Sequence, residues 1–181
     1  LLSTRLAESG QFEALKALWS AELNATEETT ARCSICFKIG ALSAEELGDI
    51  REGIGWLTRA LTLSPVRDDV LEALESLAAS GGEWLMLTDS LEECASQCVA
   101  DERRHMLRER AAAVAREKLE DCGRSERLLR AILDESPMRR GTLIALDQVL
   151  EDTEQHRALT EVLRQRLALT NEQTEVRTLL H

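Results

Sequence analysis

Tyrosine is absent from this 181-residue sequence, and only two prolines, two phenylalanines and three tryptophans are present. This low aromatic content is unfavourable for a β-sandwich or β-barrel, whose strands are rich in aromatic and β-branched residues. No apolar run approaches the roughly 20 residues that a membrane-spanning helix requires. Hydrophobic residues nevertheless make up 44% of the chain. The sequence therefore predicts a folded, helix-rich protein without a membrane segment.

The chain also lacks an excess of positive charge. Its formal net charge of −11 argues against nucleic acid and anionic membranes as partners. The charge is uneven, since residues 1–100 hold seven Lys and Arg against 17 Asp and Glu, whereas residues 101–140 hold 11 against nine. Such patches either orient a partner, pair neighbouring molecules, or form an ordinary solvated surface.

The five cysteines, an odd number, do not make a disulfide framework. A reducing, cytoplasmic compartment is the simplest expectation. The sequence begins without Met and opens and closes inside helical patterns. We therefore expect residues 1–181 to be one repeat domain cut from a longer protein.

A repeat of 72 positions organises the sequence. The stretch Leu61–Pro65, LTLSP, returns as Leu133–Pro137, LDESP, and the register holds on both sides without a gap. Leu74 corresponds to Leu146, for example. A fixed period of this kind is typical of stacked repeat proteins.

Hydrophobic spacing within this register predicts paired helices separated by Gly, Pro and capping residues. The second helix of each pair is expected to begin near residues 11, 49, 83, 121 and 155. These positions alternate by about 38 and 34 residues, so the 72-residue unit contains two unequal helical hairpins. Residues 172–180 are expected to start a sixth pair.

An isolated hairpin of this kind cannot bury its apolar stripe, whereas stacked hairpins share one continuous core. We therefore predict an all-α, right-handed α-solenoid of about five hairpins. A helical bundle is the alternative, but a bundle has no reason to keep a 72-residue register.

With the hairpins aligned, the spacing resembles that of tetratricopeptide repeats over nearly the whole chain. The matching positions are the large and small packing residues, the turn residues and the terminal prolines: Leu71, Leu74, Ala78, Gly82, Trp84, Leu91, Cys94, Pro65 and Pro137. The sequence departs from the pattern where Glu75 and Asp147 replace the Gly expected in the first helix. Some hairpins also carry about four extra residues.

The resemblance implies a protein-interaction scaffold in which the first helix of each hairpin lines a concave groove. When the groove positions of the family are transferred to this sequence, nine residues are expected to be exposed in the groove: Cys33, Cys36, Asp69, Glu72, Ser76, His105, Arg108, Ile144 and Gln148. The Lys, Arg and Asn clamp that some family members use for a C-terminal carboxylate is not matched. Arg108 and His105 are still expected to meet one anionic group.

The cysteines raise the alternative of a metal- or redox-linked sensor. Cys33 and Cys36 form a Cys-x-x-Cys motif, but residues three apart on a helix place their Cβ atoms about 5–6 Å apart. An unstrained disulfide requires about 3.8 Å, and zinc would need two more ligands. Packing of small polarisable side chains is the simpler interpretation.

No Ser-His-Asp, His-Glu-x-x-His or phosphate-binding glycine pattern can be placed in the sequence. We therefore expect a non-enzymatic scaffold with no cofactor, no bound metal and a protein or peptide partner. A structural spacer, or a segment that packs end to end as a homo-oligomer, is the competing hypothesis.

Overall fold

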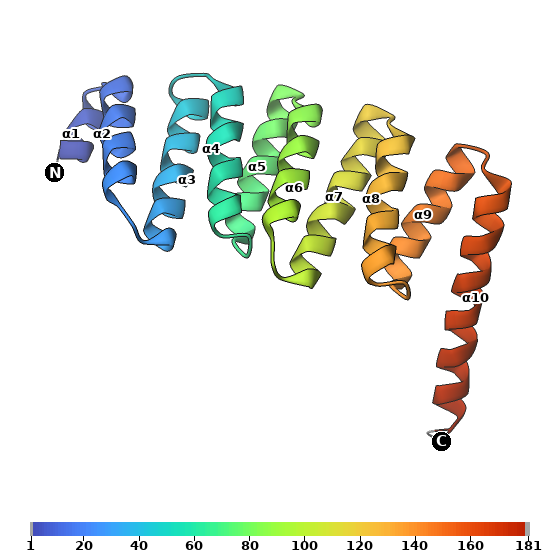
Figure 1. Ribbon diagram of the computed structural model, residues 1–181. Coiled ribbons are helices and arrows are strands. Elements are labelled where there is room, and N and C mark those ends of the chain that lie inside the picture. The colour runs from blue at the N-terminus through green and yellow to red at the C-terminus, as the bar shows by residue number, and fades with distance from the viewer. Residues whose placement is uncertain (1, 180–181) are drawn as a thin grey trace. The chain divides into compact units, whose positions relative to one another are not determined.

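The computed structural model describes the backbone of residues 2–179 and the side chains of residues 2–168. It divides into two compact units, residues 1–107 and 108–181, with the boundary inside one helix. All regular structure in the described residues is α-helical (Figure 1). The elements are α1 Leu2–Glu8, α2 Phe12–Ala25, α3 Thr29–Glu45, α4 Ile50–Leu63, α5 Asp68–Gly81, α6 Trp84–Gln97, α7 Asp101–Leu119, α8 Cys122–Glu135, α9 Arg140–Asp152 and α10 His156–Leu179.

The helices alternate between two roles, which we call A helices (α1, α3, α5, α7, α9) and B helices (α2, α4, α6, α8, α10). In residues 1–107 each A helix runs antiparallel to the B helix that follows it, as α3 and α4 show (Figure 1). This is the predicted all-α hairpin solenoid, and the prediction of fold class is confirmed. The prediction that residues 1–181 form one domain stays a prediction.

The predicted spacing of the hairpins is also confirmed. B helices begin at residues 12, 50, 84, 122 and 156, each one residue after the predicted position. Two of the predicted positions, Asp49 and Asp121, are N-cap residues whose carboxylates accept hydrogen bonds from the N–H groups of Glu52 and Arg124, at 2.9 and 2.8 Å. An N-cap carboxylate satisfies a helix N–H that has no partner within the helix.

Proline ends a helix at both copies of the LTLSP-type stretch. Ser64 and Ser136 are the C-caps of α4 and α8, with backbone angles of −142°, 79° and −139°, 76°. A residue before proline is sterically kept out of the α region, so the helix stops there. The matching angles show that the repeat extends to backbone conformation.

Within each unit, polar contacts connect a helix of one hairpin to the helix with the same role in the next hairpin. In residues 1–107, Lys16 on α2 donates to Glu52 on α4 at 2.7 Å, and Arg103 on α7 donates to Asp68 on α5 at 2.6 Å. In residues 108–181, Thr142 on α9 donates to Glu109 on α7 at 2.6 Å. These polar contacts connect B helix to B helix and A helix to A helix, while consecutive helices, such as α3 with α4 and α4 with α5, pack most closely against each other.

The sixth hairpin predicted from residue 172 is wrong. The helix α10 continues without a break from His156 to Leu179. The sequence between Leu169 and Gln173 contains neither Gly nor Pro, and these are the residues that most strongly end a helix.

Positive backbone φ angles also follow the repeat, although the residue type changes. Gly48 and Glu120 have φ of 70° and 54°, and Gly82 and Glu154 have φ of 69° and 56°. A non-glycine residue is strained in this left-handed region. We expect Glu120→Gly and Glu154→Gly each to raise the free energy of unfolding by about 0.5–1 kcal/mol, measured by denaturant titration.

The matched controls for this prediction are Gly48→Ala and Gly82→Ala. No atom lies within 4 Å of a Cβ added at either glycine, so the expected loss of about 1 kcal/mol would come from the backbone alone. Glycine variants at 120 and 154 that are less stable than the parent would show that these positions carry no strain.

Candidate protein-interaction surface

The predicted exposure of Cys33, Cys36 and His105 is wrong. Their exposed fractions are 0%, 0% and 1%. The half-buried or exposed residues of α3 include Phe37 and Lys38 instead. The predicted register was displaced by one residue in this helix, and one residue rotates a side chain by about 100° around the helix axis.

The three predicted residues on α5 do lie at the surface. Asp69, Glu72 and Ser76 are all exposed. The guanidinium of Arg67 donates to the Asp69 carboxylate, with one contact at 2.8 Å, and this hydrogen bond holds the pKa of Asp69 below its usual value. Arg67 also lies 5.8 Å from the ring centre of Phe37. This arginine therefore links the surfaces of α3 and α5.

In residues 108–181 the predicted residues Ile144 and Gln148 lie on α9, Ile144 half-buried and Gln148 exposed. Gln148 accepts a hydrogen bond from Arg116 of α7 at 2.8 Å, and Arg116 also donates to Asp152 at 2.6 Å. These two hydrogen bonds connect α7 to α9. Glu109 on α7 follows the predicted Arg108 directly, and both side chains are half-buried.

We name the surface formed by the A helices the A face. It is defined by two sets of residues, one in each unit: Phe37, Lys38, Asp69, Glu72 and Ser76 in residues 1–107, and Glu109, Ala113, Arg116 and Gln148 in residues 108–181. The small side chains of Cys33 and Cys36 fit core positions beside Ile35 and Ile39, but their spacing in the sequence is compatible with either register of α3.

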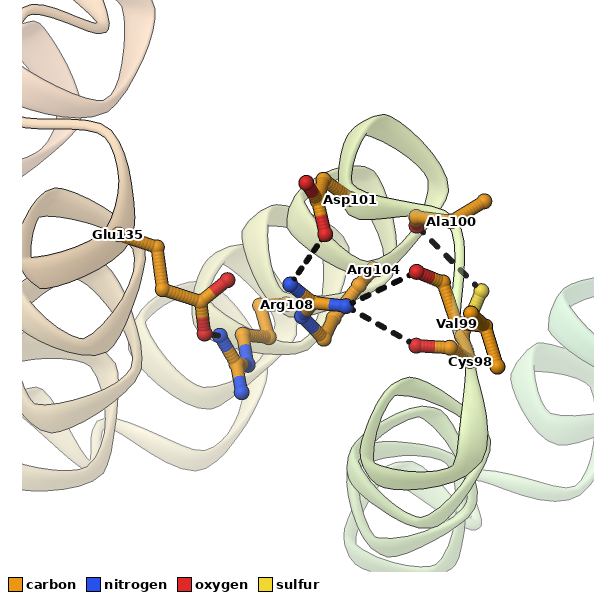
Figure 2. A network of polar contacts seen from close by, with 7 residues as sticks. All are labelled: Cys98, Val99, Ala100, Asp101, Arg104, Arg108 and Glu135. Atoms are coloured by element: carbon orange, nitrogen blue, oxygen red, sulfur yellow. Dashed lines mark hydrogen bonds and ion pairs between the residues drawn. The ribbon is translucent and has the colours of Figure 1, made fainter.

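Arg108 forms an ion pair with Glu135. Its Nη1 donates to Oε1 of Glu135 at 2.6 Å, as Figure 2 shows. In the same view Arg104 donates to the carbonyl of Cys98 at 3.1 Å and to Asp101 at 2.6 Å. Since His105 is buried, the predicted pairing of Arg108 and His105 around one anion is wrong.

Each unit has an open cavity lined mainly by its A helices and in part by the B helix packed against them. In residues 1–107 the cavity is about 290 Å³ and lies between α1, α2 and α3. Its lining includes Phe12, Trp19 and Phe37. In residues 108–181 a cavity of about 250 Å³ is lined by polar side chains that include Glu109, Arg116 and Gln148. The first cavity is mainly aromatic and apolar, and the second combines charged side chains with apolar ones such as Leu129 and Val149.

Grooves on the B helices repeat with the 72-residue period. A groove of about 520 Å³ between α4 and α6 and one of about 410 Å³ between α8 and α10 share equivalent positions. Thr62 in the first corresponds to Asp134 in the second, and Asp89 corresponds to Glu161. This recurrence indicates that the B-face grooves follow from hairpin stacking itself.

Among residues 2–168, no cluster of three or more His, Cys, Asp or Glu side chains has the arrangement of a metal site. Cys33, Cys36, Cys94 and Cys98 are buried, and Cys122 is partly exposed. Burial raises the pKa of Cys94 to about 11 and also raises the pKa of Cys33 and Cys36. A thiol is nucleophilic only as the thiolate.

We therefore expect one thiol, Cys122, to react quickly with a disulfide reagent at pH 8, and four to react only after unfolding. A Cys122→Ser variant serves as the control, because it should abolish the fast phase. Fast reaction of Cys33 or Cys36 in the native protein, located by peptide mapping, would restore the redox interpretation. Metal bound after purification, detected by elemental analysis, would support the metal interpretation.

Among the described residues, no helix has both the length and the apolar character needed to span a bilayer. No family model matches the chain. No protein with curated annotation matches it either.

Two solved structures of MamA, a tetratricopeptide-like helical protein, are similar in fold. One, "Crystal structure of MamA", matches with a TM-score of 0.52 and 11% identity over 97% of this chain and 98% of that chain. Another, "Crystal structure of MamA protein", matches with a TM-score of 0.52 and 11% identity over 96% of this chain and 90% of that chain. At this identity the likeness concerns the fold alone, and it shows that this chain has a tetratricopeptide-like helical repeat fold.

Proposed function

We propose that this chain is a non-enzymatic scaffold that binds a protein or peptide segment on its A face. The observation that carries this proposal is the pairing of a cavity with exposed polar side chains on the A face of each unit. A cavity accepts a side chain of the partner, while neighbouring polar groups fix its orientation.

The distribution of side chains in residues 1–107 supports the A face over the B face. Phe37 of the A helix α3 lines the A-face cavity together with Phe12 and Trp19, which reach it from the neighbouring B helix α2. These are both phenylalanines and one of the three tryptophans of the sequence. The B-face groove between α4 and α6 contains no aromatic residue in its lining. Aromatic side chains are enriched at interfaces because they bury a large area with few rotatable bonds.

The test compares two variants of the full chain, each of which adds the same positive charge, in affinity capture from a lysate of the source organism. The A-face variant is Glu72→Arg with Ser76→Arg, and the B-face control is Glu93→Arg with Gln97→Arg. All four side chains are exposed. A partner retained by the parent and the control but lost by the A-face variant supports the proposal. A partner lost only by the B-face variant would contradict it.

Self-association is the second candidate function, and one observation favours it. Leu163 and Leu167 on α10 are 46% and 61% exposed. The residues one 72-residue period earlier, Leu91 and Ala95 on α6, are buried. The helix α10 thus presents to solvent the positions that its counterpart buries.

Light scattering over a range of protein concentrations tests this second candidate. Self-association through α10 predicts a mass that rises with concentration in the parent and stays monomeric in Leu163→Lys with Leu167→Lys. A parent protein that is monomeric at every concentration would rule out end-to-end packing.

A further inference from the structure

The A-face cavity of residues 1–107 combines an apolar interior with an acidic edge. Apolar and aromatic side chains from three helices form its wall, among them Phe12, Trp19 and Phe37. Glu45 and Glu46 line it near the end of α3. We propose that this cavity binds one large apolar side chain of a peptide whose neighbouring residues on one side are lysine or arginine. This inference rests on the proposed scaffold function and names the chemistry of the partner.

The volume of the cavity limits the occupant. About 290 Å³ accommodates one bulky side chain, such as Phe or Leu, and not a folded domain. The three aromatic residues around it are half-buried, so each keeps part of its ring available for contact. Burying an apolar side chain against such a wall is favourable in proportion to the area removed from water.

The charges along α3 determine the orientation in which the peptide binds. Lys38 and Glu45 both line the cavity, and seven residues along a helix correspond to about 10 Å. Basic residues of the partner would therefore lie beside the glutamates, on the side of the apolar anchor away from Lys38. Complementary charge of this kind sets orientation and specificity more than raw affinity.

Two observations favour a basic over an acidic partner. Within residues 2–168, no hydrogen bond or ion pair engages the carboxylates of Glu45 and Glu46, and both side chains are exposed. Residues 1–107 also carry 19 Asp and Glu against nine Lys and Arg. This surrounding negative potential attracts a cationic segment at low ionic strength.

The test uses defined peptides and the full ¹⁵N-labelled chain. The probe is a ten-residue Gly/Ser peptide, acetylated and amidated at its ends, with one central Phe and two lysines on one side of it. Two versions are made, one with the lysines before the Phe and one with the lysines after it. Matched peptides replace Phe by Ser, or both lysines by Glu. The chain has three tryptophans, so the indole N–H signal of Trp19, assigned with Trp19→Phe, reports on the cavity.

We expect one order of the Phe–lysine peptide to shift the Trp19 signal, and the Phe→Ser peptide to bind about tenfold more weakly because the anchor is lost. The Lys→Glu peptide is also expected to bind more weakly. The variant Glu45→Lys with Glu46→Lys should remove the preference for lysine. The control variant Glu22→Lys with Glu93→Lys makes the same change in net charge outside the cavity lining and should retain it.

A second variant, Ala41→Phe, fills the cavity from α3, since Ala41 lines it, and should abolish the preference for Phe. Its melting temperature shows whether the fold is retained. Binding that shifts signals of Glu72 and Ser76 but not of Trp19 would overturn the cavity proposal and leave the A-face scaffold standing. The cavity proposal is also overturned if no Phe–lysine peptide moves the Trp19 signal at millimolar concentration.

Discussion

Replacing Leu74 by alanine is expected to lower the free energy of unfolding by about 2–5 kcal/mol, and replacing Leu146 is expected to do the same. The repeat places these leucines at equivalent positions, and they are 0% and 2% exposed. Removing either side chain takes away buried apolar area and leaves a cavity that close-packed neighbours fill only in part. Denaturant titration followed by circular dichroism measures both losses.

The repeat supplies a control for this prediction within the same molecule. Leu2 lies one further period before Leu74, but it is 59% exposed. Leu2→Ala should therefore change stability by no more than about 0.5 kcal/mol. A loss below about 0.5 kcal/mol at both Leu74 and Leu146 would show that the repeat register is wrong.

The same two variants test whether residues 1–181 unfold as one domain. Leu74 lies in residues 1–107 and Leu146 in residues 108–181. If both substitutions move one common transition, the chain unfolds as a cooperative unit, as expected for strongly coupled repeats. Two separate transitions, each moved by one variant, would contradict the single-domain prediction.

Replacing Arg166 by alanine is expected to cost about 3 kcal/mol, because it would leave a buried carboxylate without its ion-pair partner. Arg166 on α10 pairs with Asp147 on α9, and the Asp147 side chain is only 6% exposed. The lost stability should be measured against denaturant at two salt concentrations. A buried pair is screened little by salt, so the loss should be nearly the same in both.

A neighbouring arginine and a double variant serve as controls. Arg164 pairs with Glu161 at 3.5 Å, and both side chains are mostly exposed. Arg164→Ala should cost no more than about 0.5 kcal/mol. The double variant Asp147→Ala with Arg166→Ala should recover part of the loss of Arg166→Ala, since no charge is left buried. Equal losses for Arg164→Ala and Arg166→Ala would show that the Asp147 pair is not a buried one.

This ion pair also explains a departure from the tetratricopeptide pattern. Asp147 stands where the pattern has Gly in the A helix, and Arg166 stands one period after Cys94, a small buried residue of α6. A large cation at a small packing position would be unfavourable alone. Because the two changes face each other across one hairpin, they compensate. The sequence showed the acidic departure, but not the arginine that balances it.

Local features of the sequence were enough to predict the hairpins. The start of each B helix, the N-caps Asp49 and Asp121, and the stops before Pro65 and Pro137 depend on residues within a few positions of each other. The positive backbone φ follows the 72-residue register even where Glu120 replaces the glycine of Gly48. These features are set by backbone geometry and local hydrogen bonds, which a sequence displays directly.

The sequence by itself determined that this chain is an all-helical repeat protein with hairpins of alternating length, because helix periodicity and helix ends are local properties. Only the tertiary structure decided which side of α3 and α7 is exposed, because a one-residue difference in register turns Cys36 inward and Phe37 outward. It also decided that Phe12, Trp19 and Phe37 line one cavity. Contacts between helices depend on rotation about each axis, and that rotation is fixed only when the hairpins pack.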